Sequence, residues 1–302
     1  MITQFPDFKP LELFDKKYIE TFTVQFPPYS DFNFTSIWAW NTNDKFQISN
    51  LNGNLVVLFY DYVSNNPFFS FIGSNKIEDT AARILEYSIN KYGVAYLKLI
   101  PEHIINHFQN NHWNVLPDTN SDDYILSVDF LKDMDKLKKS SLSNAIRKFI
   151  KTNEKYLVKF NSIREVDNKI YFKFIEDWSN NKELSGGIIN ERIALKKYFD
   201  LQGCETKIFS LFVNGKLVAF DTCEFCSKDY AIIHFGKTDY AYSGAAEILS
   251  WEEAKYLSNL GIKFINIEQD LGISGLRYSK QKFKPSHFLK KYILQKSTSP
   301  ST

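Results

Sequence analysis

The residues best suited by type and spacing to do chemistry lie near the C-terminus. Glu268 and Asp270 close an alternating strand pattern that begins at Phe264. Carboxylates at a strand end can bind a substrate amine or accept a proton from it. The segment that follows is rich in glycine and basic residues and has no acidic residue: Gly272, Gly275, Arg277, Lys280, Lys282, Lys284, Lys290, Lys291 and Lys296. This combination predicts a site for a substrate that carries phosphate or carboxylate.

Structural alternatives stay open for these candidates. Glu268 and Asp270 could cap the turn that follows the strand, because short polar side chains satisfy turn backbone groups. Arg277, Lys280 and Lys282 are candidates for phosphate contacts, and their alternative is a solvated surface. Glu224, in another strand pattern, could act as a base, but a lone strand glutamate is usually a surface residue.

A second basic segment covers residues 136–159. Its apolar residues recur with helical spacing, which predicts an amphipathic helix: Leu142, Ala145, Ile146, Phe149 and Ile150. Arg147 and Lys148 fall on the polar face of this helix and are candidates for substrate binding. The alternative is that this face is simply solvated.

A third candidate is the start of a helix at residues 243–246. Ser243, Gly244 and Ala245 are small, and unpaired backbone N–H groups at a helix start can hold a pyrophosphate. This segment loosely resembles the pyrophosphate loop of acetyltransferases, without their arginine- or glutamine-led glycine pattern. Close packing of small residues is the equally weighted alternative.

The pattern Cys223-x-x-Cys226 is the strongest hint of a metal in the chain. Zinc needs about four ligands, and the sequence has no second cysteine pair or paired histidines at metal spacing. We therefore expect no metal site. The sequence also lacks a Walker loop, a G-x-S-x-G motif and a Rossmann glycine pattern, and nothing indicates DNA binding.

These candidates must be positioned by a pattern that occurs twice in the chain. Asn52-Gly53 and Asn214-Gly215 each separate two apolar runs, which predicts hairpins. A third strand follows each hairpin and ends at Gly73 or Gly236. A helical pattern and another strand then follow, over residues 77–92 and 94–99 in the first half and over 244–260 and 263–267 in the second. The repeat predicts a duplicated unit; coincidence between two ordinary α/β halves is the alternative.

Length and charge also favour two domains, which we place at residues 1–135 and 136–302. Residues 1–130 carry 8 basic and 15 acidic side chains, whereas residues 131–302 carry 29 and 20. The second half is therefore the expected anion-binding half, and the first is expected to be structural. No apolar run is long enough to span a bilayer, and the polar N-terminus is unlike a signal peptide. We expect a cytoplasmic protein, with peripheral contact to a membrane as an option.

Three segments resemble the C-terminal domain of phosphatidylglycerol lysyltransferases, a family of acyl-CoA N-acyltransferase fold. They are residues 26–38, residues 144–149 and the segment from Glu268 to Pro285. In the central segment the family tends to have an arginine where this chain has Ser143. The resemblance spans nearly all of residues 20–295.

The resemblance implies an α/β fold, with mixed α+β sheets, made of two tandem N-acyltransferase-like (GNAT-like) domains. It also implies an acyl- or aminoacyl-transferase with its active site in the second half and with no permanently bound cofactor. The donor would be aminoacyl-tRNA or acyl-CoA, and the acceptor a phospholipid headgroup or a small amine. Two separated basic segments favour tRNA over CoA. The alternatives are a CoA-dependent N-acetyltransferase and a non-catalytic anion-binding module.

Overall fold

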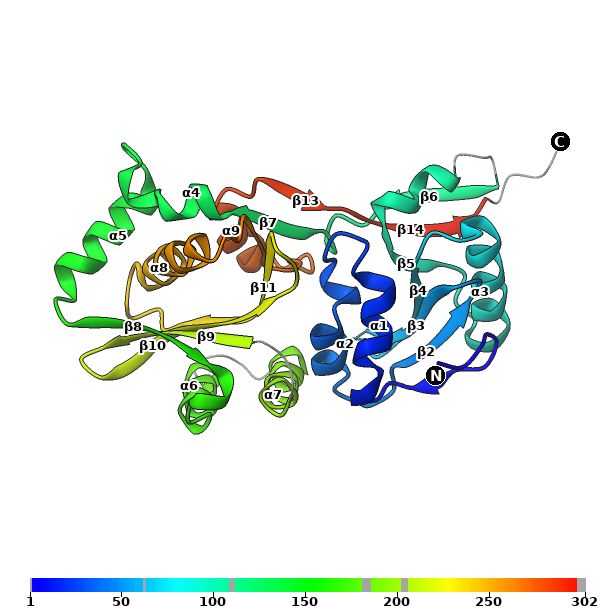
Figure 1. Cartoon of the computed structure of the whole chain (residues 1–302), viewed down its shortest axis with the longest axis horizontal. Helices are drawn as coiled ribbons and strands as arrows, with labels where there is room; N and C mark the ends of the chain where they lie inside the picture. Colours follow the sequence, from blue (N-terminus) through cyan, green and yellow to red (C-terminus); the bar gives the residue numbers. More distant parts are fainter. Residues whose placement is uncertain (1, 62–63, 109–111, 181–185, 202–205, 298–302) are drawn as a thin grey trace. The chain divides into compact units, whose positions relative to one another are not determined.

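The computed structural model describes residues 2–61, 64–108, 112–180, 186–201 and 206–297. The chain divides into two compact units, Met1–Asp122 with Leu289–Thr302, and Asp123–Phe288. Each unit contains a seven-stranded mixed sheet covered by helices (Figure 1). This architecture confirms the expected mixed α/β fold.

The first unit is built around the sheet β1-β2-β3-β4-β5-β14-β6. Helix α3 packs its apolar face against one side of this sheet, and α1 and α2 lie on the other side (Figure 1). The strands are β1 Lys9–Pro10, β2 Gln47–Leu51, β3 Asn54–Tyr60, β4 Pro67–Ile72, β5 Leu97–Pro101, β6 Trp113–Pro117 and β14 Lys291–Lys296. The helices are α1 Lys16–Thr23, α2 Phe34–Trp40 and α3 Ile77–Tyr92, with 3-10 turns η1 Leu13–Asp15, η2 Ser30–Phe32 and η3 Glu102–Phe108.

The second unit is built around the sheet β13-β7-β12-β11-β10-β9-β8. Helices α5 and α8 cover one face, and α6 and α7 lie on the other (Figure 1). The strands are β7 Asp123–Ser127, β8 Tyr156–Ser162, β9 Thr206–Val213, β10 Lys216–Phe225, β11 Tyr230–Thr238, β12 Phe264–Asn266 and β13 His287–Leu289. The helices are α4 Val128–Lys132, α5 Ser141–Thr152, α6 Lys169–Asn180, α7 Gly186–Phe199, α8 Ala245–Asn259 and α9 Ser274–Lys282, with 3-10 turns η4 Met134–Lys136 and η5 Ile163–Glu165.

The predicted repeat is present in both units. The elements occur in the same order in both units, as β2-β3-β4-α3-β5 in the first and as β9-β10-β11-α8-β12 in the second. Both hairpin turns have positive φ at both central residues, 57° and 81° at Asn52 and Gly53, and 49° and 81° at Asn214 and Gly215. This is the type I′ geometry that the Asn-Gly dipeptide favours.

Two strands lie in a different sheet from the strand that precedes them in the chain. β7 follows β6 in the chain but pairs with β12, whereas β14 follows β13 and lies between β5 and β6. The division at Asp122 and Leu289 therefore differs from the expected boundary between residues 135 and 136. Strand pairing, which joins segments far apart in sequence, sets the unit boundaries, and composition gave no sign of it.

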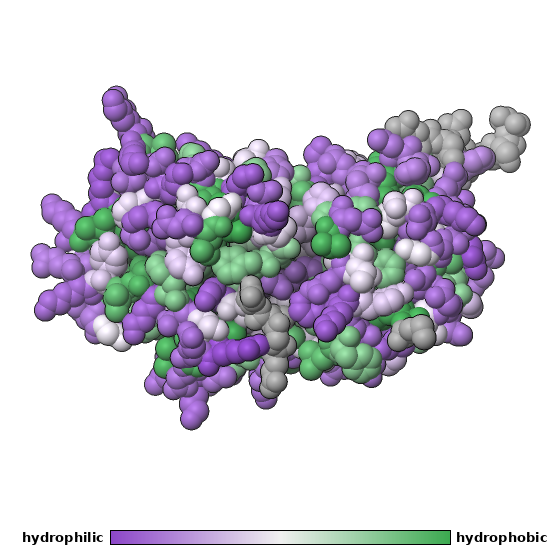
Figure 2. Space-filling model, in the orientation of Figure 1, coloured by the Kyte–Doolittle hydropathy of each residue, from purple (hydrophilic) through white to green (hydrophobic). Residues whose placement is uncertain are grey.

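The predicted amphipathic helix is α5. Leu142, Ile146 and Phe149 are buried against the core of the second unit, as expected, but Ile150 is 39% exposed. Hydrophilic side chains project from the surface over this helix (Figure 2). Across the parts of the chain that the structure describes, no helix is both long enough and apolar enough to cross a membrane.

Candidate functional site

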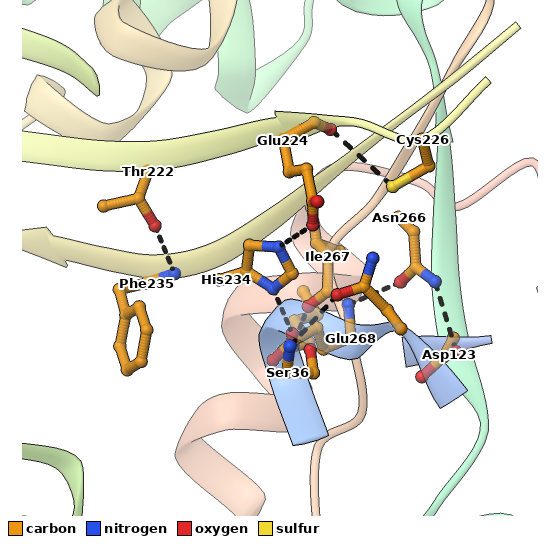
Figure 3. Close-up of polar contacts among 12 residues, drawn as sticks. Ser36, Asp123, Thr222, Glu224, Cys226, His234, Phe235, Asn266, Ile267 and Glu268 are labelled. Carbon is orange, nitrogen blue, oxygen red and sulfur yellow. Dashed lines mark hydrogen bonds and ion pairs between the residues drawn. The ribbon is translucent and has the colours of Figure 1, made fainter. Parts of the chain in front are cut away.

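A β-bulge in β11 brings a histidine into the site. Thr222 of β10 lies opposite Phe235, but the next residue, Cys223, lies opposite Ile233. His234 is therefore the extra residue of the bulged strand. A bulge re-aims the side chain that it carries, and here the imidazole is directed toward Glu224 and Glu268 (Figure 3).

The sheet opens next to this bulge. β11 runs to Thr238, but it pairs with the parallel strand β12 only from Tyr230 to Ile232. β12 ends at Asn266, and the chain then turns at Glu268, which has a φ of 60°. A left-handed backbone is uncommon for a residue other than glycine and often marks a functional position. The turn places the Glu268 carboxylate beside the bulge.

Glu224, His234 and Glu268 form a continuous triad (Figure 3). His234 Nε2 lies 3.0 Å from Glu224 Oε2, and His234 Nδ1 lies 3.1 Å from Glu268 Oε1. The exposed fractions of the three side chains are 8%, 1% and 16%, respectively. Glu268 is therefore the member of the triad that a substrate could reach most easily.

The two carboxylates determine the charge of the imidazole. Burial on its own would lower the pKa of His234, but the hydrogen bonds and charges of Glu224 and Glu268 outweigh it and raise the pKa to about 9. His234 is therefore cationic at neutral pH and has no lone pair with which to accept a proton. It can hold Glu268 in place through the contact between Nδ1 and Glu268 Oε1.

The backbone at Glu268 is held from both sides. Asn266 Oδ1 accepts a hydrogen bond of 2.7 Å from Glu268 N, and Asn266 Nδ2 donates to Asp123 Oδ2 at 3.1 Å. The buried Lys280 ammonium donates to the carbonyl of Ile267, the residue before Glu268. These contacts stabilise the left-handed turn on which the carboxylate stands.

Asp270 is fully buried and its oxygens are engaged by the protein. It receives hydrogen bonds from Arg277 Nε at 2.7 Å, Arg277 Nη2 at 3.0 Å, Tyr124 Oη at 2.5 Å and Gly272 N at 2.8 Å. Burial would raise the pKa of Asp270, but these donors together lower it below its usual range. A carboxylate of this kind is a poor proton acceptor, so the geometry favours the turn-stabilising alternative for Asp270. Arg277 is engaged in an ion pair with this carboxylate.

Lys280 lies in the interior rather than on a phosphate-binding surface. Burial lowers its pKa to about 8, although the charges of Glu268, Asp123 and Asp270 act in the opposite direction. A lysine in this setting is neutral in part just above neutral pH. Its position supports a role in ordering Glu268 instead of the predicted contact with an anion.

The start of α8 is occupied by the protein itself. Gly244 has a φ of 92°, and a Cβ at this position would lie 2.6 Å from the carbonyl oxygen of Ala145 in α5. Glu247, a buried acid in the first turn, forms an ion pair with Lys282. A carboxylate here takes the place that the helix dipole would offer to a pyrophosphate. This geometry favours the packing alternative for Ser243, Gly244 and Ala245, and it gives Lys282 an internal partner.

The remaining predicted residues lie on α5. Arg147 Nη2 donates to the carbonyl of Asp135 at 3.0 Å, and Lys148 is exposed on the same helix. Four of the predicted site residues lie close together in the structure: Glu268, Asp270, Arg277 and Lys280. Arg147 and Lys148 form a separate surface.

His234 was not among the predicted site residues. Glu224 was a candidate base with a surface residue as its alternative, and the structure shows it buried. A weak signal was present, since the two residues lie ten positions apart on strands β10 and β11, which a short connection joins. Regular pairing would not have predicted their contact, because it depends on the bulge.

The sequence profile described as "Phosphatidylglycerol lysyltransferase, C-terminal" matches residues 24–295. The chain belongs to this family. No curated protein matches the chain. Family and fold together support an acyl- or aminoacyl-transferase of the phosphatidylglycerol lysyltransferase type.

Several solved structures share the fold. A conserved protein of unknown function from Bacteroides thetaiotaomicron is 21% identical with a TM-score of 0.80, over 98% of this chain and 100% of that one. L-PGS from Bacillus licheniformis is 15% identical with a TM-score of 0.61, over 99% and 95%. A tandem GNAT protein from the clavulanic acid biosynthesis pathway is 9% identical with a TM-score of 0.52, over 98% and 99%. At these identities the likeness shows the fold alone, which is that of two tandem GNAT-like domains.

Proposed function

We propose that the second unit transfers an aminoacyl group from aminoacyl-tRNA to a hydroxyl or amine of an acceptor molecule. The observation that carries this proposal is the triad Glu224–His234–Glu268 at the opening between β11 and β12. In this proposal Glu268 is the catalytic residue that accepts the proton of the acceptor. His234 and Glu224 are positioning residues that act through Glu268.

The reaction needs one proton to move twice. The acceptor oxygen or nitrogen attacks the carbonyl carbon of the aminoacyl ester as its proton passes to Glu268. The bond between that carbon and the ribose oxygen of the tRNA then breaks, and the proton passes from Glu268 to the ribose oxygen. A positioned proton acceptor of this kind contributes roughly 10²- to 10⁴-fold in rate.

The choice of donor rests on where anions could bind. The α8 start carries Glu247 and packs against α5, which disfavours a pyrophosphate at that place. Exposed basic side chains on α5, Lys148 among them, suit a phosphate backbone. We infer that tRNA is the donor, and a phospholipid headgroup is the acceptor that the family name suggests.

The test is a transfer assay with purified protein and a panel of radiolabelled aminoacyl-tRNAs. Each is offered with phosphatidylglycerol vesicles, with a small polyamine, or with neither. We expect label to move to one acceptor, and the rate to fall about 100-fold or more in Glu268→Gln. Undiminished transfer by Glu268→Gln would contradict the assigned role. Acetyl transfer from acetyl-CoA, with no transfer from any aminoacyl-tRNA, would replace this proposal with the CoA-dependent alternative.

A further inference from the structure

Two acidic side chains outside the triad interact electrostatically between β10 and α8, which pack against each other. Glu253 of α8 is only 2% exposed, and its Oε1 has no hydrogen-bond partner among the described residues. Asp221 of β10 retains partial exposure and interacts electrostatically with Glu253. Burial of a carboxyl group without a partner is costly, so a folded chain rarely keeps one without a use.

Asp221 lies beside the opening in the sheet. It pairs with Gly236 of β11, and a Cβ on Gly236 would lie 2.3 Å from Asp221 Oδ1. The missing side chain therefore makes the room that the carboxylate occupies. Gly236 is four residues past Ile232, the last residue of β11 that pairs with β12. Because side chains alternate along β10, Asp221 points to the α8 face, and Glu224 points to the opposite face.

The charges around the pair are unbalanced. Burial raises the pKa of Asp221 to about 7 although Lys237 opposes it, and burial together with Asp221 raises the pKa of Glu253 well above its usual range. Another ionisable group on this face of β10 is the Cys223 thiol, whose pKa burial also raises. Lys237 itself forms an ion pair of 2.5 Å with Glu191. As the pH rises through about 7, the pair therefore gains a negative charge, which a bound cation could offset.

We propose that Asp221 and Glu253 form a subsite for the primary ammonium group of the aminoacyl donor. The donor would then enter the opening from the α8 face, and its carbonyl would lie between this subsite and Glu268. The identity of the ligand as an aminoacyl group rests on the proposed function. The ammonium could be the α-amine of any aminoacyl group or the side-chain amine of a lysyl group.

Three small amides separate these possibilities in a saturation-transfer NMR binding experiment on the whole chain. Alaninamide carries only an α-ammonium, Nα-acetyllysinamide carries only a side-chain ammonium, and Nα-acetylalaninamide carries neither. We expect one or both of the first two to bind, and the third not to bind. Since the cation favours ionised Asp221, the affinity should rise between about pH 6 and about pH 7.5.

Isosteric variants complete the test. Asp221→Asn should weaken binding about tenfold or more, and Glu253→Gln should weaken it less, since a group with so high a pKa is mostly neutral. Asp229→Asn, which alters an exposed acid of the same unit, is the matched control. Equal binding of all three amides, or unchanged binding in folded Asp221→Asn, would overturn the subsite. Either result would leave the triad untouched, and a failed transfer assay with intact ammonium binding would instead contradict the proposed reaction.

Discussion

Glu268 in the second unit occupies the position that Leu99 occupies in the first. Both residues have a left-handed backbone, with φ of 60° and 59°. Each lies two residues after the one that pairs in parallel across the sheet, Leu97 with Phe69 and Asn266 with Ile232. The left-handed residue at this position is thus a feature of the repeated fold, although in the first unit it lies within β5 and in the second it follows the end of β12.

His234 in the second unit likewise occupies the position that Phe71 occupies in the first. Each lies two residues after the parallel pair on the neighbouring strand, and Phe71 and Leu99 are both buried. β3 and β4 also pair without a bulge. The first unit therefore keeps the left-handed residue and has apolar side chains in place of His234 and Glu268, but it lacks the bulge.

Replacing Glu268 by leucine should give the second unit the side chain of the first. We expect Glu268→Leu to fold, because Leu99 shows that this backbone accepts leucine, and to lose transfer activity by about 10²- to 10⁴-fold. Circular dichroism and kcat/KM measure the two effects. Glu268→Gln keeps the shape and serves as the matched variant. A Glu268→Leu protein with more than about half of the original activity would show that another group accepts the proton.

The stability of the protein should depend on His234 in alkaline solution. Its pKa is raised to about 9, so the ion pairs stabilise the folded state fully below about pH 6.5 and are lost as the pH rises through about 9. We expect the free energy of unfolding to fall over this window, and the fall to be absent in His234→Gln. Urea denaturation at a series of pH values measures both.

Asp221 and Lys280 also make the stability depend on pH, over adjacent pH ranges. His234→Gln must therefore be compared with the unmodified chain. The raised pKa of Asp221 makes stability fall as the pH rises toward about 7. The lowered pKa of Lys280 makes stability rise as the pH passes from about 8 toward 10.5. Parallel pH profiles for His234→Gln and the unmodified chain would mean that His234 carries no charge in the folded state.

Gly244→Ala should destabilise the second unit. A Cβ there would lie 2.6 Å from Ala145 O and 3.0 Å from Phe149 Cβ, on a backbone with a φ of 92°. We expect a loss of about 1–3 kcal/mol in the free energy of unfolding. Gly275→Ala is the control, because a Cβ at Gly275 in α9 meets nothing within 4 Å. Equal stabilities of the two variants would show that α8 and α5 do not pack as described.

Binding of tRNA should fall steeply with salt if the donor is correctly inferred. Lys148→Ala should reduce the slope of log K against log salt by about 0.7–0.9, since the side chain is exposed. Lys282 was also a candidate for phosphate contacts, but its side chain forms an ion pair with the buried Glu247. Lys282→Ala should instead lower the melting temperature with little change in slope. Filter binding at several salt concentrations distinguishes the two, and identical slopes for Lys148→Ala and the unmodified chain would remove Lys148 from the interface.

Local sequence signals predicted most of the repeated unit. Asn-Gly turns, glycines after helices and the spacing of apolar residues each act over a few residues, so β9 to β12 and their counterparts could be located. Glu268 could likewise be predicted as a site residue, because the strand pattern and the turn that position it are adjacent to it in the sequence. The expected end of the third strand at Gly236 was wrong, because β11 continues to Thr238.

The parts that were not predicted depend on contacts between distant segments. The bulge at His234 arises from the pairing of β10 with β11. The His234 side chain then contacts both Glu224 and Glu268, which lie far apart in the sequence. The burial of Asp270 requires Tyr124, which lies 146 residues earlier. The exchange of β7 and β14 leaves no local trace, because a strand in its own sheet and one in another sheet have the same pattern.

The position of β14 also affects the order in which the protein can fold as it is made. Domains usually fold one after another during synthesis, the N-terminal one first. Here the sheet of the first unit needs Lys291–Lys296 between β5 and β6, although nearly the entire second unit is translated before that strand. Until then β5 and β6 have unpaired facing edges, which are prone to pair with other chains. Nascent chains that are stopped before residue 291 should therefore depend on chaperones to stay unaggregated, however well their second unit is formed.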